Sequence, residues 1–399
     1  MGLKYRIKDL CEINSENISK NDYLKYIHYL DTSNLTRGSI NEIQKYIVGK
    51  DKIPSRAKRK VKINDILIST VRPNQRHYGI IRKGQENLIV STGYTVLSPK
   101  VDKVNQDYLY WYLTQDSIIN YLQSIAESST SAYPSIKPSV ISELEIDLPD
   151  LEEQETIANI LSTLNEKLET NNQINEKLEE MAQALFKHWF IDFEFPNENG
   201  EPYKSSGGEM VDSELGMIPK GWQVGHLSDL IEIRYGKDHK KLRDGDIPVY
   251  GSGGVMRFVD TALYTSESVL VPRKGTLNNV MYTSHPFWSV DTMFYTEMKE
   301  QDIAKYIYCF LKTKDLASMN IGSAVPSMTT AILNKMPIVI QPLNVINRFN
   351  RIVNPFFAQI DLSLKENDKL GQVRDRLLPK LMSGEIRVPL DDEALEVKS

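Results

Sequence analysis

Two segments of the chain place cationic and amide side chains directly after a run of residues that favours a β-strand. The first, Arg72–His77, follows Ile66–Val71, and the second, Arg273–Asn279, follows Ser268–Val271. In the major groove of DNA, arginine pairs with guanine, and asparagine or glutamine pairs with adenine, each through two hydrogen bonds. Surface turns have a similar composition, so the pattern leaves both interpretations open. The candidates for base contact are Arg72, Asn74, Gln75, Arg76, Arg273, Lys274 and Asn278.

Basic residues are concentrated in one part of the chain. Between Lys45 and Lys83 there are 12 basic and two acidic residues, although the whole chain has a formal net charge of −5. Residues 151–200 have the opposite balance, with 11 acidic residues and three lysines. A basic segment can bind DNA phosphates within an acidic protein, because counterions are released locally; a solvated loop is the alternative. The candidates for phosphate contact are Lys58, Arg59, Lys60 and Lys62, followed by the weaker set Lys240, Lys241 and Arg243.

Three other patterns resemble catalytic motifs but lack residues that the chemistry needs. Asn354–Phe357 lacks the second proline of the Asn-Pro-Pro-aromatic loop of amino-methyltransferases. Asp291, Glu297 and Lys299 resemble the set of a metal-dependent nuclease, but the equivalent segment Gly93–Lys100 contains neither acid. Gly251–Gly254 lacks the lysine of a phosphate-binding loop, and a tight turn near the DNA is the better interpretation. We therefore predict that this chain has no catalytic residue and no metal site.

The framework that carries the candidate loops is duplicated. Asp9–Ile13 returns as Asp229–Ile233 at an offset of 220 positions, whereas Tyr133–Ile136 returns as Val325–Met328 at an offset of 192. The first copy is therefore longer inside by 220 − 192 = 28 residues. One scaffold with two unlike inserts predicts two different readers, and hence an asymmetric, interrupted DNA target.

Each copy ends in a segment that predicts a long helix. Asp150 followed by Glu153 is a capping pattern, and apolar residues then recur at heptad-like spacing through Phe190. The stripe consists of Ile157, Ile160, Leu164, Ile174, Leu178, Met181 and Leu185. An offset of 192 places a matching stripe on the second copy, where Pro355 predicts a kink or a late start. We expect the two helices to pair as an antiparallel coiled coil with pseudo-two-fold symmetry; amphipathic helices lying on their own domains are the alternative.

The remaining segments predict domains of mixed α/β (α+β) class. Short runs of β-branched and aromatic residues indicate strands, while Tyr108–Leu113 and Tyr306–Leu311 indicate helices whose aromatic side chains belong to a core. The expected organisation is a first recognition domain at 1–149, a helical spacer and linker at 150–208, a second recognition domain at 209–341, and a helical spacer and tail at 342–399.

Composition excludes several classes of protein. The 399 residues are 41% hydrophobic and 25% charged, and no apolar run approaches the roughly 18 residues of a membrane helix. Cys11 and Cys309 are far apart and form no Cys-x-x-Cys pair, so buried free thiols are expected. We expect a cytoplasmic protein.

Five groups of residues form motifs whose order and spacing cover almost the whole chain. They are Asp147–Gln154, Ile174–Lys187, Trp189–Phe193, Met210–Gly216 with Ile218–Trp222, and Leu377–Val388. Together these motifs closely resemble the specificity (S) subunit of type I restriction-modification systems.

The resemblance implies a division of labour between subunits. In that family two target-recognition domains read the halves of a split sequence in double-stranded DNA, and antiparallel helices dock two modification (methyltransferase) subunits. Adenine methylation from S-adenosylmethionine belongs to those partners, and ATP- and Mg-dependent translocation and cleavage belong to restriction subunits, so this chain itself needs no cofactor. The implied docking residues are Leu151, Glu153 and Gln154, although the second copy has Leu343-Asn344-Val345-Ile346 at the equivalent place.

Two functions of other classes remain open at this point. A coiled-coil assembly protein tethering two protein-binding domains would also explain the helices and the inserts. A self-sufficient nuclease or methyltransferase would need the motifs that are missing.

Overall fold

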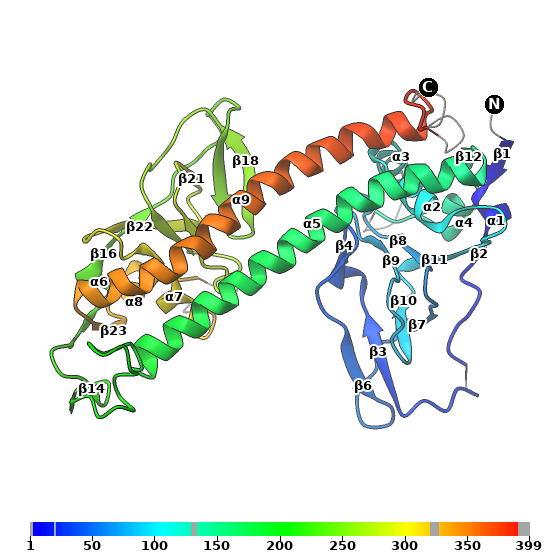
Figure 1. The fold of residues 1–399 in the computed structure, drawn as a ribbon. Coiled ribbons are helices and arrows are strands. Elements are labelled where there is room, and N and C mark those ends of the chain that lie inside the picture. Colours follow the sequence, from blue (N-terminus) through cyan, green and yellow to red (C-terminus); the bar gives the residue numbers. More distant parts are fainter. Residues whose placement is uncertain (1–2, 20, 129–133, 320–326, 390–399) are drawn as a thin grey trace, which may run out of the picture. The chain divides into compact units, whose positions relative to one another are not determined.

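The computed structural model describes residues 3–19, 21–128, 134–319 and 327–389. The chain forms two compact units, Met1–Thr170 with Glu366–Ser399, and Asn171–Lys365. The division cuts through both long helices, so each unit combines one recognition domain with a part of each helix. Each unit is described by itself below (Figure 1).

The first domain contains two four-stranded sheets. One has the order β2-β11-β8-β9 with antiparallel neighbours, and the other has the order β6-β3-β10-β7, in which β10 and β3 are parallel. Two small antiparallel pairs, β1-β12 and β4-β5, complete the strands described there. The strands are β1 (Leu3–Arg6), β2 (Cys11–Ile13), β3 (Tyr26–Leu30), β4 (Leu35–Thr36), β5 (Ser39–Ile40), β6 (Gln44–Ile47), β7 (Ala57–Lys60), β8 (Ile66–Ser69), β9 (Tyr78–Ile80), β10 (Leu88–Ser91), β11 (Tyr94–Pro99) and β12 (Glu145–Leu148). The helices are α1 (Ile7–Leu10), α2 (Gln106–Leu113), α3 (Asp116–Glu127) and α4 (Pro138–Ser142).

The second domain repeats one of these sheets and changes the other. Its sheet β16-β22-β19-β20 has the same order of equivalent strands as β2-β11-β8-β9, and β15-β23 repeats β1-β12. The other sheet has three strands, β18-β17-β21, in place of four. The strands are β13 (Met210–Val211), β14 (Ile218–Pro219), β15 (Gln223–His226), β16 (Ile231–Tyr235), β17 (Ile247–Gly251), β18 (Gly254–Val259), β19 (Ser268–Pro272), β20 (Met281–Thr283), β21 (Trp288–Ser289), β22 (Met293–Met298) and β23 (Pro337–Ile340). The helices are α6 (Leu227–Leu230), α7 (Ala304–Lys312) and α8 (Thr330–Asn334).

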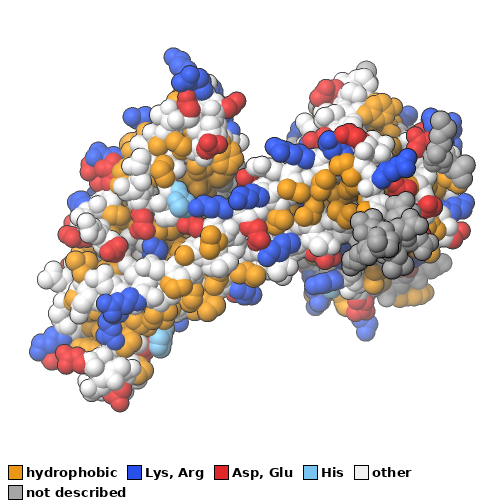
Figure 2. Space-filling model, turned by 45° about the horizontal axis from the view of Figure 1, so that its top comes forward, with side chains coloured by type: hydrophobic (Ala, Val, Ile, Leu, Met, Phe, Trp, Pro, Cys, Tyr) orange, Lys and Arg blue, Asp and Glu red, His pale blue; other side chains and the backbone are white. Residues whose placement is uncertain are grey.

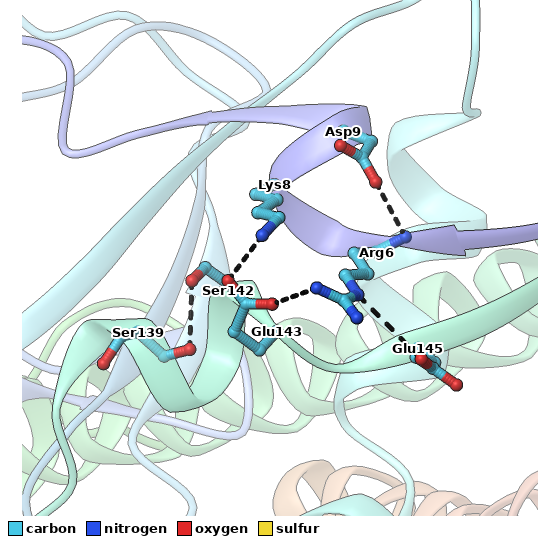
Figure 3. Close-up of polar contacts among 7 residues, drawn as sticks. All are labelled: Arg6, Lys8, Asp9, Ser139, Ser142, Glu143 and Glu145. Carbon is cyan, nitrogen blue, oxygen red and sulfur yellow. Dashed lines mark hydrogen bonds and ion pairs between the residues drawn. The ribbon is translucent and has the colours of Figure 1, made fainter.

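The repeated Asp9–Ile13 motif caps a one-turn helix at the start of each domain. The backbone N–H of Arg6 donates to Asp9 Oδ2 at 3.2 Å, and that of His226 donates to Asp229 Oδ2 at 2.8 Å. In the first domain Arg6 and Lys8 also reach Glu143 just after α4, at 2.9 and 2.7 Å (Figure 3). The repeat therefore marks a junction where the first strand, the short helix and α4 are tied together.

The long helices are α5 (Leu151–Phe186), which continues as a π-helical turn over Lys187–Ile191, and α9 (Leu343–Met382). In the first unit, Ile157 and Leu161 near the start of α5 share a core with Leu378 and Leu381 near the end of α9. In the second unit, Phe186 at the end of α5 contacts Phe349 near the start of α9, with ring centroids 6.4 Å apart. These two sets of contacts confirm the antiparallel pairing.

The helix α9 runs through Pro355 without interruption. The alternative of a late start is therefore wrong, because the helix begins twelve residues earlier, at Leu343. Asp150 is also confirmed as the cap of α5, since its Oδ1 accepts from the backbone N–H of Glu153 at 2.9 Å.

The predicted apolar stripe of α5 is wrong in its middle. Ile174 and Met181 are 42% and 51% exposed, whereas Asn171, Asn175 and Ala182 are buried at 2%, 9% and 1% exposure. An α-helix has 3.6 residues per turn, so its buried face drifts by about 20° per heptad away from a strict seven-residue repeat. After two to three heptads the drift moves Ile174 and Met181 toward solvent and brings Asn175 and Ala182, one position later, into the seam. Asn171 and Lys167 are the polar residues that interrupt the predicted stripe, and Asn171 is buried as its heptad position predicts.

The cores match the sequence expectations for aromatic residues and cysteines. Tyr108 and Trp111 of α2, and Tyr306 and Phe310 of α7, are buried at 1% to 7% exposure. Cys11 and Cys309 are buried free thiols. Among the described residues, no helix combines the length and apolar character that crossing a membrane requires.

Candidate nucleic-acid interface

The repeated Pro-Ser segment holds both candidate reading loops in the same way. In the first domain, the backbone N–H of Arg72 donates to Pro134 O at 2.9 Å, and that of Ile136 donates to Thr70 O at 2.9 Å. In the second domain, the N–H of Met328 donates to Arg273 O at 2.8 Å, next to an antiparallel bridge between Lys274 and Ser327. Each repeat therefore clamps the chain where a central strand ends and a reading loop begins. Tyr133, Val325 and Pro326 of the motif lie outside the described residues.

The first loop is a 3₁₀ turn, Pro73–Gln75, flanked by two arginines in the left-handed region. Arg72 has φ +47° and Arg76 has φ +57°. Residues other than glycine adopt this conformation at a cost, and such strain is concentrated at functional sites. The side chains of Asn74 and Gln75 are exposed at the turn. The turn thus presents both amides outward on a backbone that its neighbours hold in place.

Helix α3 and a neighbouring turn support this loop. Gln123 Oε1 accepts from the backbone N–H of Asn74 at 3.1 Å, and Arg76 Nη1 donates to Asp116 Oδ1 at 2.6 Å. The backbone carbonyl of Arg76 accepts from the N–H of Arg37 at 2.9 Å. Arg76 is therefore already paired and only partly exposed, whereas Asn74 and Gln75 are exposed. Of these two amides, Gln75 Oε1 lies 3.2 Å from His77 Nε2.

In the second domain the equivalent loop is supported by a glycine-rich hairpin. Asn279 Nδ2 donates to Ser252 O at 2.9 Å, in the turn between β17 and β18. Gly275 has φ +87°, a conformation that favours glycine, and a Cβ atom there would lie 2.7 Å from Ser252 Oγ, so the serine side chain would have to turn away. The structure brings the Gly251–Gly254 turn, interpreted from sequence as a turn near the DNA, directly beside the reading loop.

The two cationic side chains of the second loop differ in their contacts and in their exposure to solvent. The Arg273 guanidinium lies over the ring of Tyr235, 5.5 Å from its centroid, and donates to Asp291 O at 3.2 Å. Lys274 is exposed. Tyr235, which is 52% exposed, was missed by sequence reasoning; its only signal is an aromatic residue beside the glycine of Arg234–Lys237.

Asn278 is used inside the domain. Its Nδ2 donates to Asp315 Oδ1 at 3.0 Å, and its Oδ1 accepts from the N–H of Ala317 at 2.9 Å. The bond from Asn278 also holds the pKa of the Asp315 carboxyl below its ordinary value. Both polar ends of this amide therefore position the segment after α7. Its predicted base contact would require these bonds to break.

The phosphate candidates of the first domain are partly neutralised by acids outside the basic stretch. Lys60 Nζ lies 2.6 Å from Asp22 Oδ1, and Lys62 pairs with Glu16. Arg59 is half-buried, and burial lowers the pKa of its guanidinium. Lys58 is exposed. The charge count along the sequence could not register these pairings, because the acids precede the basic segment.

The weaker basic set lies on the surface of the second domain. Lys240 and Lys241 are exposed, and Arg243 is 90% exposed at its side chain while its Nε donates to Asp260 Oδ2 at 2.9 Å. Figure 2 shows acidic and basic side chains interspersed on the face in view.

The docking candidates at the start of α5 fall into two groups. Leu151 is 44% exposed, and Glu153 is partly exposed. Gln154 is 1% exposed, and its amide bridges Asn105 N and Pro149 O at 2.9 Å each. Its side chain therefore ties α5 to the start of α2 and lies inside the domain, not on a surface that a partner can touch.

In the second copy a different residue attaches the long helix to its domain. Ile346, which takes the place of Gln154, is buried at 3% exposure. Asn350, one turn later, donates from Nδ2 to Asp302 O at 2.6 Å just before α7. The missing Glu-Gln pair in this copy thus reflects a different internal brace between the long helix and its domain.

Large apolar side chains remain exposed along the helices. In the second unit these are Ile174 and Met181 on α5, and Leu343, Ile352, Leu362 and Leu364 on α9, at 42% to 62% exposure. Single exposed apolar residues are common on protein surfaces, and a contiguous patch is what marks a protein-binding surface, so these residues are candidates for docking and not evidence of it.

The residues that resemble catalytic motifs in the sequence have other surroundings in the structure. Asn354–Phe357 lies within α9, and Phe357 is buried at 5% exposure. Glu297 pairs with Arg234 at 3.2 Å, and Asp291 is exposed. Within the described parts of the chain, no three His, Cys, Asp or Glu side chains lie together so that they could hold a metal ion.

Comparison with known proteins agrees with this two-domain architecture. The family model of the type I restriction modification DNA specificity domain matches residues 3–180 and 219–372. The chain therefore belongs to this family and is a specificity subunit of a type I restriction-modification system. Family membership favours a role in DNA specificity over the alternative of a general tethering protein.

The relatives that match along most of the chain carry the same description. The specificity subunit of the type I restriction enzyme HindI of Haemophilus influenzae is 28% identical, over 84% of this chain and 89% of that protein. The MjaIX specificity subunit of Methanocaldococcus jannaschii is 29% identical, over 78% of this chain and 76% of that protein. The crystal structure of a type I S subunit from M. genitalium covers 96% of both chains with a TM-score of 0.56 and 18% identity, which shows a shared fold.

Proposed function

We propose that each recognition domain reads one half of an asymmetric, bipartite sequence in double-stranded DNA. The observation that carries this proposal is the equivalent placement of the two reading loops. Both leave a central strand beside a clamped Pro-Ser segment, yet they display different side chains on different supports. Equivalent placement favours a shared task, and different side chains favour different bases.

Direct readout in this proposal falls to exposed groups. In the first domain these are the amides of Asn74 and Gln75, and in the second they are Lys274 and the turn around Ser252. Lys58, Lys240 and Lys241 supply phosphate contacts that add affinity for any sequence, since they are exposed and lie outside the reading loops.

The long helices dock two modification subunits in this proposal. The exposed apolar residues of α5 and α9, together with Leu151 and Glu153, offer the surface. Methylation of adenine from S-adenosylmethionine takes place in those partners in the cytoplasm, and ATP- and Mg-dependent cleavage takes place in restriction subunits that join the complex. This chain then contributes recognition and assembly without binding a cofactor of its own.

Sequencing of methylated sites in cells that express the chain with its modification partner tests the proposal. The wild-type chain should yield one interrupted, asymmetric methylated sequence. Gln75→Ala should relax one half of that sequence and Lys274→Ala the other half. A palindromic methylated sequence, or two variants that relax the same half, would contradict the assignment of one reader to each domain.

A further inference from the structure

A cleft of about 220 Å³ lies beside the reading loop of the first domain. Its lining includes three arginines from three elements and two aspartates that offset part of their charge. Arg37 comes from the turn between β4 and β5, Arg76 from the reading loop, and Arg374 from the part of α9 in the same unit; Asp116 and Asp375 are the acids. Three cations and two anions leave one positive charge in the cleft.

Two of these arginines occupy a backbone conformation that disfavours them. Arg37 has φ +49° and is followed by Gly38 at φ +84°, in a two-residue turn where asparagine or glycine is normally preferred. Arg76 has φ +57°. Strain of this kind persists only where the surrounding structure holds it, and it is concentrated at functional sites.

The guanidinium groups are also held in place. Arg374 Nη1 donates to Asn165 Oδ1 at 3.1 Å, and its Nη2 lies 2.9 Å from Asp375 Oδ1. Arg76 Nη1 is fixed by Asp116 at 2.6 Å. Arg37 is tied to the loop by its backbone, which bonds to Arg76 O, while its side chain is exposed. The arrangement is a preorganised set of donors with one guanidinium that no acid of the cleft balances.

The second domain is an internal control for this cleft. An offset of 192 places Phe357 at the position of Asn165, and Ala182 at the position of Arg374. There the ring of Phe357 packs against Tyr282 and Tyr308, with centroids 4.9 and 5.8 Å apart. The junction thus holds Phe357 among aromatic rings in the second copy. In the first copy Tyr78, Tyr110 and Trp111 line an open cleft together with the three arginines.

We propose that this cleft binds a phosphate group, and that the function is confined to the first domain. Guanidinium groups present forked donors that match phosphate oxygens, and the cleft has room for such a group. The phosphate belongs either to a DNA backbone or to a small free ligand, and both sources share this chemistry. The inference depends on the cleft alone and does not require the proposed DNA reading.

Calorimetric titration of the full chain with inorganic phosphate, at fixed ionic strength, tests the proposal. Arg37→Gly removes the unbalanced guanidinium while placing glycine where φ is positive, so the protein should remain folded with an equal or higher Tm. We expect phosphate binding to weaken about tenfold or more, as the loss of a charge-assisted hydrogen bond implies. Asn165→Phe, which copies the second domain, should abolish binding. Arg376→Ala is the matched control, because Arg376 is an exposed neighbour on α9 outside the cleft lining.

Duplex DNA then distinguishes the two sources. Displacement of phosphate by a duplex of random sequence identifies a backbone phosphate as the occupant, whereas phosphate binding that DNA leaves unchanged identifies a free ligand. Either result supports the cleft. Absence of phosphate binding to the wild-type chain, or equal binding by the Arg37→Gly and Arg376→Ala variants, overturns the proposal. Because the phosphate titration contains no DNA, its failure is separate from failure of the proposed function.

Discussion

Replacing Gln154 distinguishes an internal brace from a docking contact. The side chain is 1% exposed and makes two hydrogen bonds, to Asn105 N and Pro149 O. Gln154→Ala leaves both partners without this amide, and both lie at half-buried positions where water can replace part of each bond. We expect the free energy of unfolding of the first unit to fall by about 1 to 3 kcal/mol. For a unit of about 200 residues, each kcal/mol lowers Tm by about 2 to 4 °C.

The assay combines thermal unfolding with assembly. Differential scanning calorimetry of the full chain should show a lower transition for the first unit in the Gln154→Ala variant. Co-purification with the modification subunit below that transition should be unchanged. Leu151→Ala is the matched control on the same helical turn, because its exposed side chain should affect assembly more than stability. A Gln154→Ala variant with normal Tm and lost assembly would refute the reasoning and restore Gln154 as a docking residue.

Three further predictions follow from the described contacts. Asn74→Ala should reduce discrimination at one base of the target by about 1 to 3 kcal/mol. Lys58→Ala should instead weaken binding to cognate and random duplexes alike, and should lower the slope of log affinity against log salt concentration by roughly one. Fluorescence anisotropy with both duplexes at several salt concentrations measures these effects, and equal effects of the two variants would contradict the prediction. Asn279→Ala releases the glycine-rich turn at Ser252 from the second reading loop, so it should broaden only the second half of the methylated sequence, while a change in the first half would count against the pairing of turn and loop. Burial raises the pKa of the Cys11 thiol to about 12, which keeps it protonated at pH 8. Mass spectrometry should therefore find Cys11 and Cys309 unmodified by iodoacetamide in the folded chain and fully modified in urea. Rapid labelling in the folded chain would disprove the burial.

Local patterns along the sequence predicted the framework well. The duplicated Asp9–Ile13 motif corresponds to a helix cap in each domain, and the residues around Asp150 correctly placed the start of α5. Strands near Ile66 and Ser268, and the aromatic helices α2 and α7, also follow from side chains that repeat at short intervals. These strands, helices and caps depend on residues that are close together in the sequence, so local patterns are enough to predict them.

The phase of the long helices was less predictable. Heptad spacing suggested that Ile174 and Met181 face the partner helix, but accumulated drift exposes them and buries Asn175 and Ala182 instead. Which side of a long helix is buried depends on its contacts along the whole length, and those contacts are with residues far away in the chain.

The pairing state of each candidate side chain was decided by tertiary structure alone. The sequence by itself determined that the chain is a duplicated scaffold with two unlike inserts, because repeated motifs and their spacing are visible along the chain without knowledge of the fold. It could not show that Arg76 faces Asp116, that Asn278 bonds to Asp315, or that Gln154 lies inside the first domain. Each of these contacts joins residues between 37 and 49 positions apart, across the separation that only folding closes. Charge and hydrogen bonding act over a few ångströms, so whether a cation or an amide remains available to DNA depends on what the fold places beside it.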